Sequence, residues 1–149
     1  MRKARWLALA LTLIPAGLAG QGTGTSAQEW DVTQARGQSR VVDFTTEEGT
    51  WLSVDVSPDG SWMVFDLVGH IYRAPTSGGG EAVSLTQDAG ISMNYMPRIS
   101  PDGRTIVFVS DRKGQANLWI MDADGANPKA VFTDRNVRAS LPAWTPDGR

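Results

Sequence analysis

The sequence predicts an all-β fold built from repeated four-stranded units, and three observations support this prediction. The tetrapeptide Ser-Pro-Asp-Gly at residues 57–60 returns at 100–103 and, with threonine first, at 145–148, in steps of 43 and 45 residues. Short β-rich segments flank the copies in the same order. No stretch after Gln28 has sustained helical periodicity. A repeat of about 40–50 residues is typical of the four-stranded blades of a β-propeller.

Each copy contains the same series of strand-like segments. In the first copy they cover residues 51–56, 62–67, 70–74 and 82–86. In the second they cover 95–99, 105–110, 117–121 and 129–133, and in the third only 141–144 is present. Glycine, proline, aspartate and asparagine separate them, as is usual between strands. We therefore predict a truncated propeller over 44–149, with two complete blades at about 44–86 and 87–133 and an incomplete one at 134–149.

The repeated tetrapeptide has the chemistry of a tight turn. Proline pre-sets φ for the first central position of a type I turn, aspartate suits the second, and glycine can adopt the left-handed conformation that closes a bulged hairpin. The Ser or Thr hydroxyl before the proline can bond the turn backbone. Residues 77–80 and 122–125 lie where the third and fourth strands must be joined, and both contain glycine.

The segment 106–109, Ile-Val-Phe-Val, is apolar on both faces instead of alternating. A strand that is buried on both faces has this pattern, whereas a sandwich with one wet face would favour alternation. In a propeller the inner strands of a blade lie between two neighbouring blades. We expect the first blade to cover one side of this strand. The other side would be covered only by a third blade, which this chain merely begins.

Residues 1–27 have the features of a cleaved secretory signal. Arg2, Lys3 and Arg5 precede an apolar stretch at 6–20 that is short for a bilayer-spanning helix. Small residues at 25–27 allow cleavage before Gln28, and 17–19 offer a competing site. An uncleaved anchor is the alternative, but we do not expect a stable one. Residues 28–43 are polar and aperiodic, and we expect them to lead into the propeller.

Composition limits the compartment and the partners of the chain. It has no cysteine, so it has neither a disulfide framework nor a lipid-attachment cysteine, which suits a bacterial periplasm or secretion. Removing residues 1–27 leaves 11 basic and 16 acidic residues, a net charge of −5. No cluster of Lys and Arg remains, so neither nucleic acid nor an anionic membrane surface is an expected partner.

The sequence predicts no catalytic residue, cofactor-binding residue or metal ligand in this chain. A zinc site needs about three ligands, and His70 is the only histidine, so we expect it at the surface or between blades. Residues 122–125, Asp-Ala-Asp-Gly, look like the start of a calcium loop, but Asn127 and Thr133 stand where glycine and glutamate are required. A hairpin turn explains them better.

Other chemistries have a structural explanation too. There is no Gly-x-Ser-x-Gly elbow, and the glycines at 78–80 precede a strand-like segment instead of the Gly-Lys-Ser/Thr and helix of a phosphate loop. Asp59, Asp102 and Asp147 recur in step with the turns, as turn geometry requires. Trp119 and Tyr72 occupy matching third-strand positions, which indicates packing between blades. Ligand stacking at Trp51 remains the alternative for an aromatic side chain near the first blade.

Residues 100–133 (SPDGRTIVFVSDRKGQANLWIMDADGANPKAVFT) resemble a TolB-type propeller repeat, a relative of WD-type repeats, and the pattern covers 44–149. Residues 47–86 are similar to the opening blade of exported amidohydrolases, in which a TolB-like propeller precedes a metal-dependent hydrolase barrel. The likeness lies in Glu-Gly-Thr-Trp at 48–51, Val-Asp-Val-Ser-Pro-Asp-Gly at 54–60 and the run at 65–72. His70 departs from it, because an acidic residue is expected at that position.

The resemblance implies a role for the chain within a larger protein. The chain would be the non-catalytic N-terminal propeller of an exported amidohydrolase acting on C–N or related bonds. A divalent metal such as zinc would lie in a downstream catalytic domain that this chain lacks. That domain, or a periplasmic protein, would be the partner. The alternatives are a TolB-like periplasmic scaffold for protein–protein contacts and the propeller of a prolyl oligopeptidase-type serine peptidase.

Overall fold

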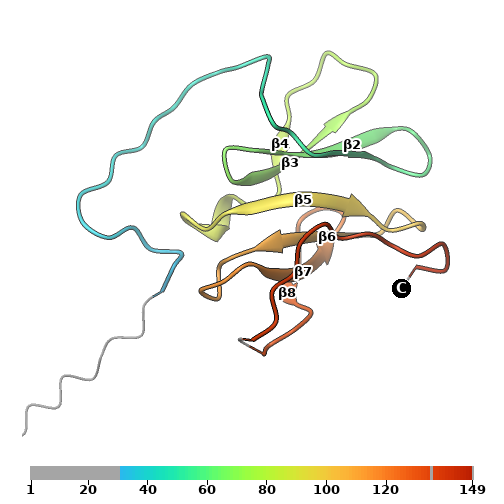
Figure 1. Ribbon diagram of the computed structural model, residues 1–149. Helices are drawn as coiled ribbons and strands as arrows, with labels where there is room; N and C mark the ends of the chain where they lie inside the picture. Colours follow the sequence, from blue (N-terminus) through green and yellow to red (C-terminus); the bar gives the residue numbers. More distant parts are fainter. Residues whose placement is uncertain (1–30, 135, 149) are drawn as a thin grey trace, which may run out of the picture.

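The computed structural model describes residues 31–134 and 136–148, and they form two four-stranded antiparallel sheets (Figure 1). Both sheets have their strands in sequence order. The first contains β1 (Val54–Val56), β2 (Trp62–Leu67), β3 (His70–Pro75) and β4 (Val83–Ser84). The second contains β5 (Asn94–Ile99), β6 (Thr105–Ser110), β7 (Asn117–Asp122) and β8 (Lys129–Ala130), after a short 3-10 helix, η1 (Gln87–Ala89). The predicted all-β fold of propeller blades is confirmed.

Two sequence predictions concern the N-terminal part of the chain. The proposed signal at 1–27 lies outside the described residues, so it stays a prediction, as do the exact domain boundaries. The described part of the lead-in, residues 31–43, contains no strand. Within the described ranges, no helix is long and apolar enough to cross a membrane.

The repeated turn has the predicted conformation. Gly60, Gly103 and Gly148 have φ values of 70°, 72° and 79°, which is the left-handed region that glycine adopts without strain. In the first copy the Ser57 hydroxyl donates to Asp59 Oδ1 over 2.6 Å and accepts from the Trp62 backbone N–H over 3.1 Å. The second copy repeats both bonds, at 2.6 and 2.9 Å. Side chains within the tetrapeptide therefore help to close the turn in both copies.

The turn carboxylate gives the first prediction on stability. Hydrogen bonds from the Ser57 hydroxyl, then from the backbone N–H and hydroxyl of Ser61, lower the pKa of Asp59 from 3.8 to about 2. A carboxyl whose pKa is lower in the folded state stabilises the fold above its unfolded pKa, and this contribution is lost as the pH falls through the folded pKa. In urea unfolding, the difference between wild type and Asp59→Asn should narrow between pH 3.8 and about 2. A difference that is constant over that range would contradict this assignment.

The core lies between the two sheets. Strand β6 is buried along most of its length, with Ile106, Phe108 and Val109 at 0% exposure, as its sequence predicted. Side chains from both sheets form one apolar cluster. Its members are Trp62, Val64, Ile71, Ile99, Ile106, Phe108, Trp119 and Met121. Because a single sheet could not bury these side chains, the two blades depend on each other for their core.

The outer side of β6 is covered, contrary to the sequence expectation. Val107 and Val109, on the side away from the first sheet, are 5% and 0% exposed. The C-terminal segment runs along this side (Figure 1), and it is tied down where Trp144 Nε1 donates to the Arg98 carbonyl over 3.1 Å and Gln115 Nε2 donates to the carbonyl of Val137 over 2.9 Å. A C-terminal segment without a strand therefore lies where we expected a third sheet.

The third copy is also less regular than predicted. Residues 141–144 do not form a strand, although the following turn is closed by a bond from Gly148 N to the Thr145 carbonyl over 2.9 Å. A strand is defined by pairing with another strand, whereas this turn needs only local bonds. The turn sequence alone was therefore a sound predictor of the turn but not of the strand before it.

Two carboxylates of the first sheet hold the inner edge of the second. Asp66 is 9% exposed, and its two oxygens accept from the backbone N–H groups of Ser53 over 2.8 Å and of Met96 over 2.6 Å. Asp55 Oδ2 accepts from the Ile99 N–H over 2.7 Å. Hydrogen bonds to a charged acceptor are stronger than neutral ones. These bonds fix the position of one blade relative to the next.

The held edge contains an irregularity in strand β5. Its register with β6 shifts between Tyr95 and Arg98, and Met96 inside this bulge has a positive φ of 56°. A bulge leaves one residue outside the ladder. The N–H of Met96 is satisfied by Asp66 instead. At the start of the strand, Asn94 N donates to the Gly69 carbonyl over 2.8 Å, so backbone groups of the first blade hold this edge as well.

Candidate functional site

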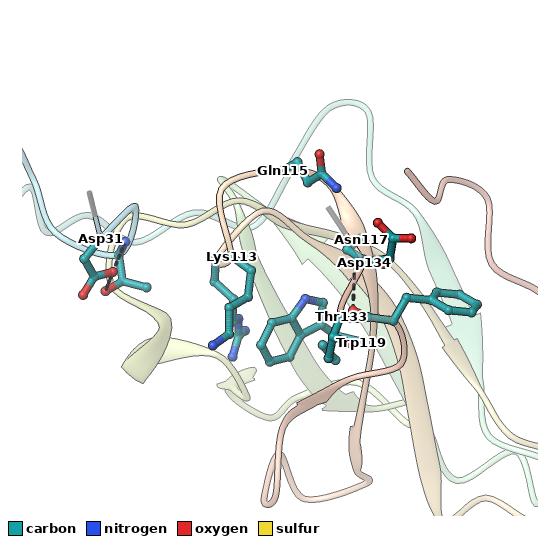
Figure 2. A pocket seen from close by; sticks show the side chains of 11 residues that line it. Asp31, Lys113, Gln115, Asn117, Trp119, Thr133 and Asp134 are labelled. Carbon is teal, nitrogen blue, oxygen red and sulfur yellow. Dashed lines mark hydrogen bonds between the residues drawn. The ribbon is translucent and has the colours of Figure 1, made fainter. Parts of the chain in front are cut away.

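A cavity of about 670 Å³ lies beside β7 and β8 and next to residues 31–33 (Figure 2). The loop between β6 and β7, strand β7, the loop after β8 and the N-terminal segment each contribute side chains to its wall. Those used below are Asp31, Arg112, Lys113, Asn117, Trp119 and Phe132. Its size is in the range of small-molecule sites. We treat this cavity as the candidate functional site of the described residues.

Strand periodicity places Asn117 and Trp119 on the same side of β7, facing the cavity. Both side chains are 5% exposed. Asn117 Nδ2 donates to the Phe132 carbonyl over 2.9 Å, and its Oδ1 accepts from the Leu118 N–H over 2.7 Å. The buried amide thus fastens the loop after β8 to the start of β7, and this fixes one wall of the cavity.

The N-terminal segment forms the opposite wall and is held by the loop before β5. The Ile91 N–H donates to the Thr33 carbonyl over 3.2 Å. Gly90 has a φ of 61°, and a Cβ at this position would come within 2.0 Å of the Thr33 oxygen. Only glycine permits so close an approach, so Gly90 positions residues 31–33 at the cavity.

Arg112 lines the cavity and packs against aromatic rings. Its guanidinium carbon lies 4.7 Å from the centroid of the Trp119 ring and 5.5 Å from that of Phe108, within the range of a cation–π contact. Nε donates to the Ser110 hydroxyl over 3.0 Å and Nη2 to Asn94 Oδ1 over 2.7 Å. Burial is the main effect on the pKa of Arg112 and lowers it below its usual value, while the charge of Asp111 opposes this. The guanidinium stays charged, and it is partly removed from water.

The aspartates around the cavity accept bonds from nearby backbone. Asp31 Oδ1 accepts from the Thr33 N–H over 2.9 Å and from the Thr33 hydroxyl over 2.7 Å. These bonds, chiefly that from the hydroxyl, lower the pKa of Asp31, and the charge of Lys113 adds to the effect. Asp134 Oδ1 accepts from the Asn136 N–H over 2.8 Å. The two carboxylates therefore cap turns at the rim of the site.

The structure places the sequence candidates outside this cavity. His70 Nδ1 lies 3.1 Å from the Thr86 carbonyl, at the start of β3. In the hairpin at 122–125, Gly125 has a φ of 90°, and Asn127 Nδ2 donates to Asp122 Oδ2 over 2.7 Å. Trp51 is 98% exposed. None of these side chains lines the cavity, and the glycines at 78–80 do not line it either.

Over residues 31–134 and 136–148, no group of three or more His, Cys, Asp or Glu side chains lies close enough to hold a metal ion. The zinc that the resemblance implies would lie in a separate catalytic domain, and it stays a prediction.

Sequence reasoning missed the two cations of the site. It identified Trp119 as a packing residue, and the burial of this ring agrees with that interpretation. Arg112 and Lys113 follow directly after the most apolar strand of the chain. That change from an apolar run to two adjacent cations was the one available signal. The approach of residue 31 to residue 113 had no signal, because it depends on the path of a loop without regular structure.

Comparison with known proteins supports the fold. No family model matches the chain. It is 40% identical over 79 residues to the uncharacterized peptidase YuxL of Bacillus subtilis, covering 52% of this chain and 11% of that protein. It is 32% identical over 110 residues to the Tol-Pal system protein TolB of Wolinella succinogenes, covering 70% of this chain and 25% of that protein.

A solved Agrobacterium tumefaciens structure assigned to TolB matches with a TM-score of 0.52 and 22% identity, over 64% of this chain and 34% of that one. The chain thus spans a quarter or less of the length of YuxL and of the Wolinella TolB. The match agrees with the two four-stranded sheets, their order and their shared core. The described residues form part of a TolB-like β-propeller.

Proposed function

We propose that this chain supplies a non-catalytic β-propeller module to a larger exported hydrolase that cleaves amide-type C–N bonds. The proposal rests on the TolB-like blades of this chain and on its identity to a peptidase. The match covers only 11% of the length of that peptidase. A protein of that length has room for a separate catalytic domain. The propeller would then control access to that domain or bind its substrate.

Two parents fit this description. The resemblance of residues 47–86 favours a metal-dependent amidohydrolase, with zinc held by the other domain. The identity to a peptidase over 79 residues favours a peptidase. Both cleave a bond between a carbonyl carbon and nitrogen, and this shared chemistry is the substrate class that we assign to the whole protein. The signal-like residues 1–27 support export to the periplasm or beyond it.

A TolB-like scaffold is the second candidate function. The match to the Tol-Pal system protein TolB covers 70% of the chain, against 52% for the peptidase. In that case the partner would be a periplasmic protein, and the propeller surface itself would be the functional part.

The test uses the complete reading frame that contains this chain. We expect the purified protein to hydrolyse amide or peptide substrates, and a variant lacking residues 44–149 to keep its chemical competence on small substrates while losing selectivity among large ones. Inhibition by a chelator would identify an amidohydrolase parent, and inhibition by a serine-directed reagent a peptidase parent. A complete protein that contains only propeller blades, or that shows no hydrolysis, would overturn the proposal in favour of the scaffold.

A further inference from the structure

Residues 41–45, Val-Val-Asp-Phe-Thr, form an exposed, strand-like segment before the first sheet. They lie on the long loop that leads to β1 and projects away from both sheets (Figure 1). Val41, Val42 and Phe44 are 95%, 63% and 60% exposed. No hydrogen bond joins residues 41–45 to another residue that the structure describes. Valine and phenylalanine favour strands and are usually buried, so this segment has the composition of a strand without the neighbour that a strand needs.

The repeat identifies which strand this segment corresponds to. Phe132 and Phe44 each stand 13 residues before the first residue of the repeated turn, at 145 and at 57. Residues 41–45 therefore correspond to residues 129–133, which begin with β8, the fourth strand of the second sheet. The first sheet already has its own fourth strand, β4. By position, residues 41–45 would thus complete a blade that precedes the first one.

The side of the first sheet that faces away from the second is a separate observation. Val64 and Ile71 belong to the shared core, so the alternation of a strand places Phe65 and Tyr72 on the opposite side. Their rings stack with centroids 5.7 Å apart. No described sheet covers this side. We call it the free face, and its apolar members are Val54, Val56, Met63, Phe65 and Tyr72.

The second sheet shows what covers such a face. Phe108 and Trp119 form a pair between β6 and β7, as Phe65 and Tyr72 do between β2 and β3. Phe108 and Trp119 are buried in the cluster that joins their sheet to the first. The repeat therefore packs the preceding blade on this side of a sheet. The equivalent cover for the free face is the blade that residues 41–45 would complete.

We propose that residues 41–45 add as the fourth, outermost strand to a three-stranded antiparallel sheet formed elsewhere in the complete protein, and that this sheet packs on the free face. Residues 46–53 would then lead from that blade to β1, as residues 85–93 lead from β4 to β5. A second copy of this chain does not fit, because both of its described sheets already have four strands. This joint does not depend on the hydrolase assignment, since a scaffold made only of propeller blades would need it equally.

Hydrogen–deuterium exchange of the complete protein, measured by mass spectrometry, tests the added strand. Peptides that cover residues 41–45 should exchange about tenfold more slowly than those that cover 36–40, because amides paired in a sheet are protected. Equally fast exchange in the two segments would overturn the proposal. Protection that is lost on dilution of a dimer would overturn it as well, because the partner would then be a second copy.

Proline variants locate the pairing. In the second sheet the Val131 N–H donates to the Leu118 carbonyl over 2.8 Å, and Asp43 is the residue that corresponds to Val131. Asp43→Pro removes this donor and should abolish the protection of residues 41–45. Gln38→Pro is the matched control in the same exposed loop and should leave the protection unchanged. Equal protection in the two variants would contradict the pairing.

Lysine variants test the packing on the free face. Val56→Lys places a charge on this face and should lower the thermal midpoint of the complete protein and speed the exchange of residues 41–45. Val56 is 50% exposed to solvent in the two-sheet body, so that body itself should tolerate the change. Val83→Lys is the matched control, because Val83 is 63% exposed and pairs with Arg73 on the other side of the first sheet. Equal midpoints for the two lysine variants would show that no sheet packs on the free face.

Discussion

Replacing Asp66 with alanine should lower the free energy of unfolding by about 3 to 5 kcal/mol, since two backbone donors lose a charged acceptor at once. The carboxylate is 9% exposed and accepts from Ser53 N and Met96 N, one in each blade. Each N–H would be left without a partner at a site that water reaches poorly, and a buried unsatisfied donor costs about 1–3 kcal/mol. The effect should exceed that of removing any exposed carboxylate in the chain.

Urea unfolding of the complete protein, followed by tryptophan fluorescence, measures this effect. Asp88→Ala is the control, because Asp88 is an exposed carboxylate and makes no side-chain hydrogen bond with a described residue. Asp66→Asn keeps one acceptor oxygen and should fall between Asp66→Ala and wild type. If Asp66→Ala and Asp88→Ala lose the same small amount, the bridging role of Asp66 is wrong.

Phe108→Ala should destabilise the fold to a similar degree, by about 3 to 5 kcal/mol. The Phe108 ring is 0% exposed and belongs to the cluster shared by both sheets. Truncation would remove the contacts of the ring and leave a cavity between the blades, which the strands on either side cannot easily close. The loss should appear in both blades because they share this core.

Phe132→Ala is the matched control for Phe108→Ala. Phe132 is 44% exposed, and its structural bond to Asn117 uses the backbone carbonyl, which alanine retains. We expect it to cost about 1 kcal/mol or less. Thermal unfolding by circular dichroism would compare the two variants, and similar midpoints for both would show that Phe108 does not have the central position described here.

The sequence predicted the parts of this fold that depend on neighbouring residues. The Ser-Pro-Asp-Gly turn closes through bonds within five residues, such as that from Trp62 N to Ser57, so its sequence was sufficient. The double-sided burial of β6 followed from its composition. The bonds from Asp55 and Asp66 to β5 were not predictable, because they join residues 44 and 30 positions apart and depend on how the two sheets dock.

The candidate site depends almost entirely on contacts between residues that are far apart in the sequence. Arg112 meets Asn94 across 18 residues, and the wall near Asp31 depends on a close approach to Gly90. Motif reasoning examined His70 and the 122–125 hairpin because their residue types suggest chemistry. The cavity is instead lined by residues that belong to no recognised motif, and only the folded arrangement brings them together. Repeat folds often present this difficulty, since the repeat explains the framework and leaves the loops unassigned.

The bonds from the first sheet to β5 also bear on self-association. β5 is an edge strand, and the unpaired N–H groups of such an edge are a template on which another chain can add a strand. Here the N–H groups of Asn94, Met96 and Ile99 are already occupied by Gly69, Asp66 and Asp55. At the other edge of each sheet, β4 and β8 are only two residues long. An incoming strand would have to displace the Asp55 and Asp66 carboxylates at the β5 edge, and it would find almost no length to pair with at β4 or β8. The bonds that orient the blades thus also protect the β5 edge against uncontrolled strand addition.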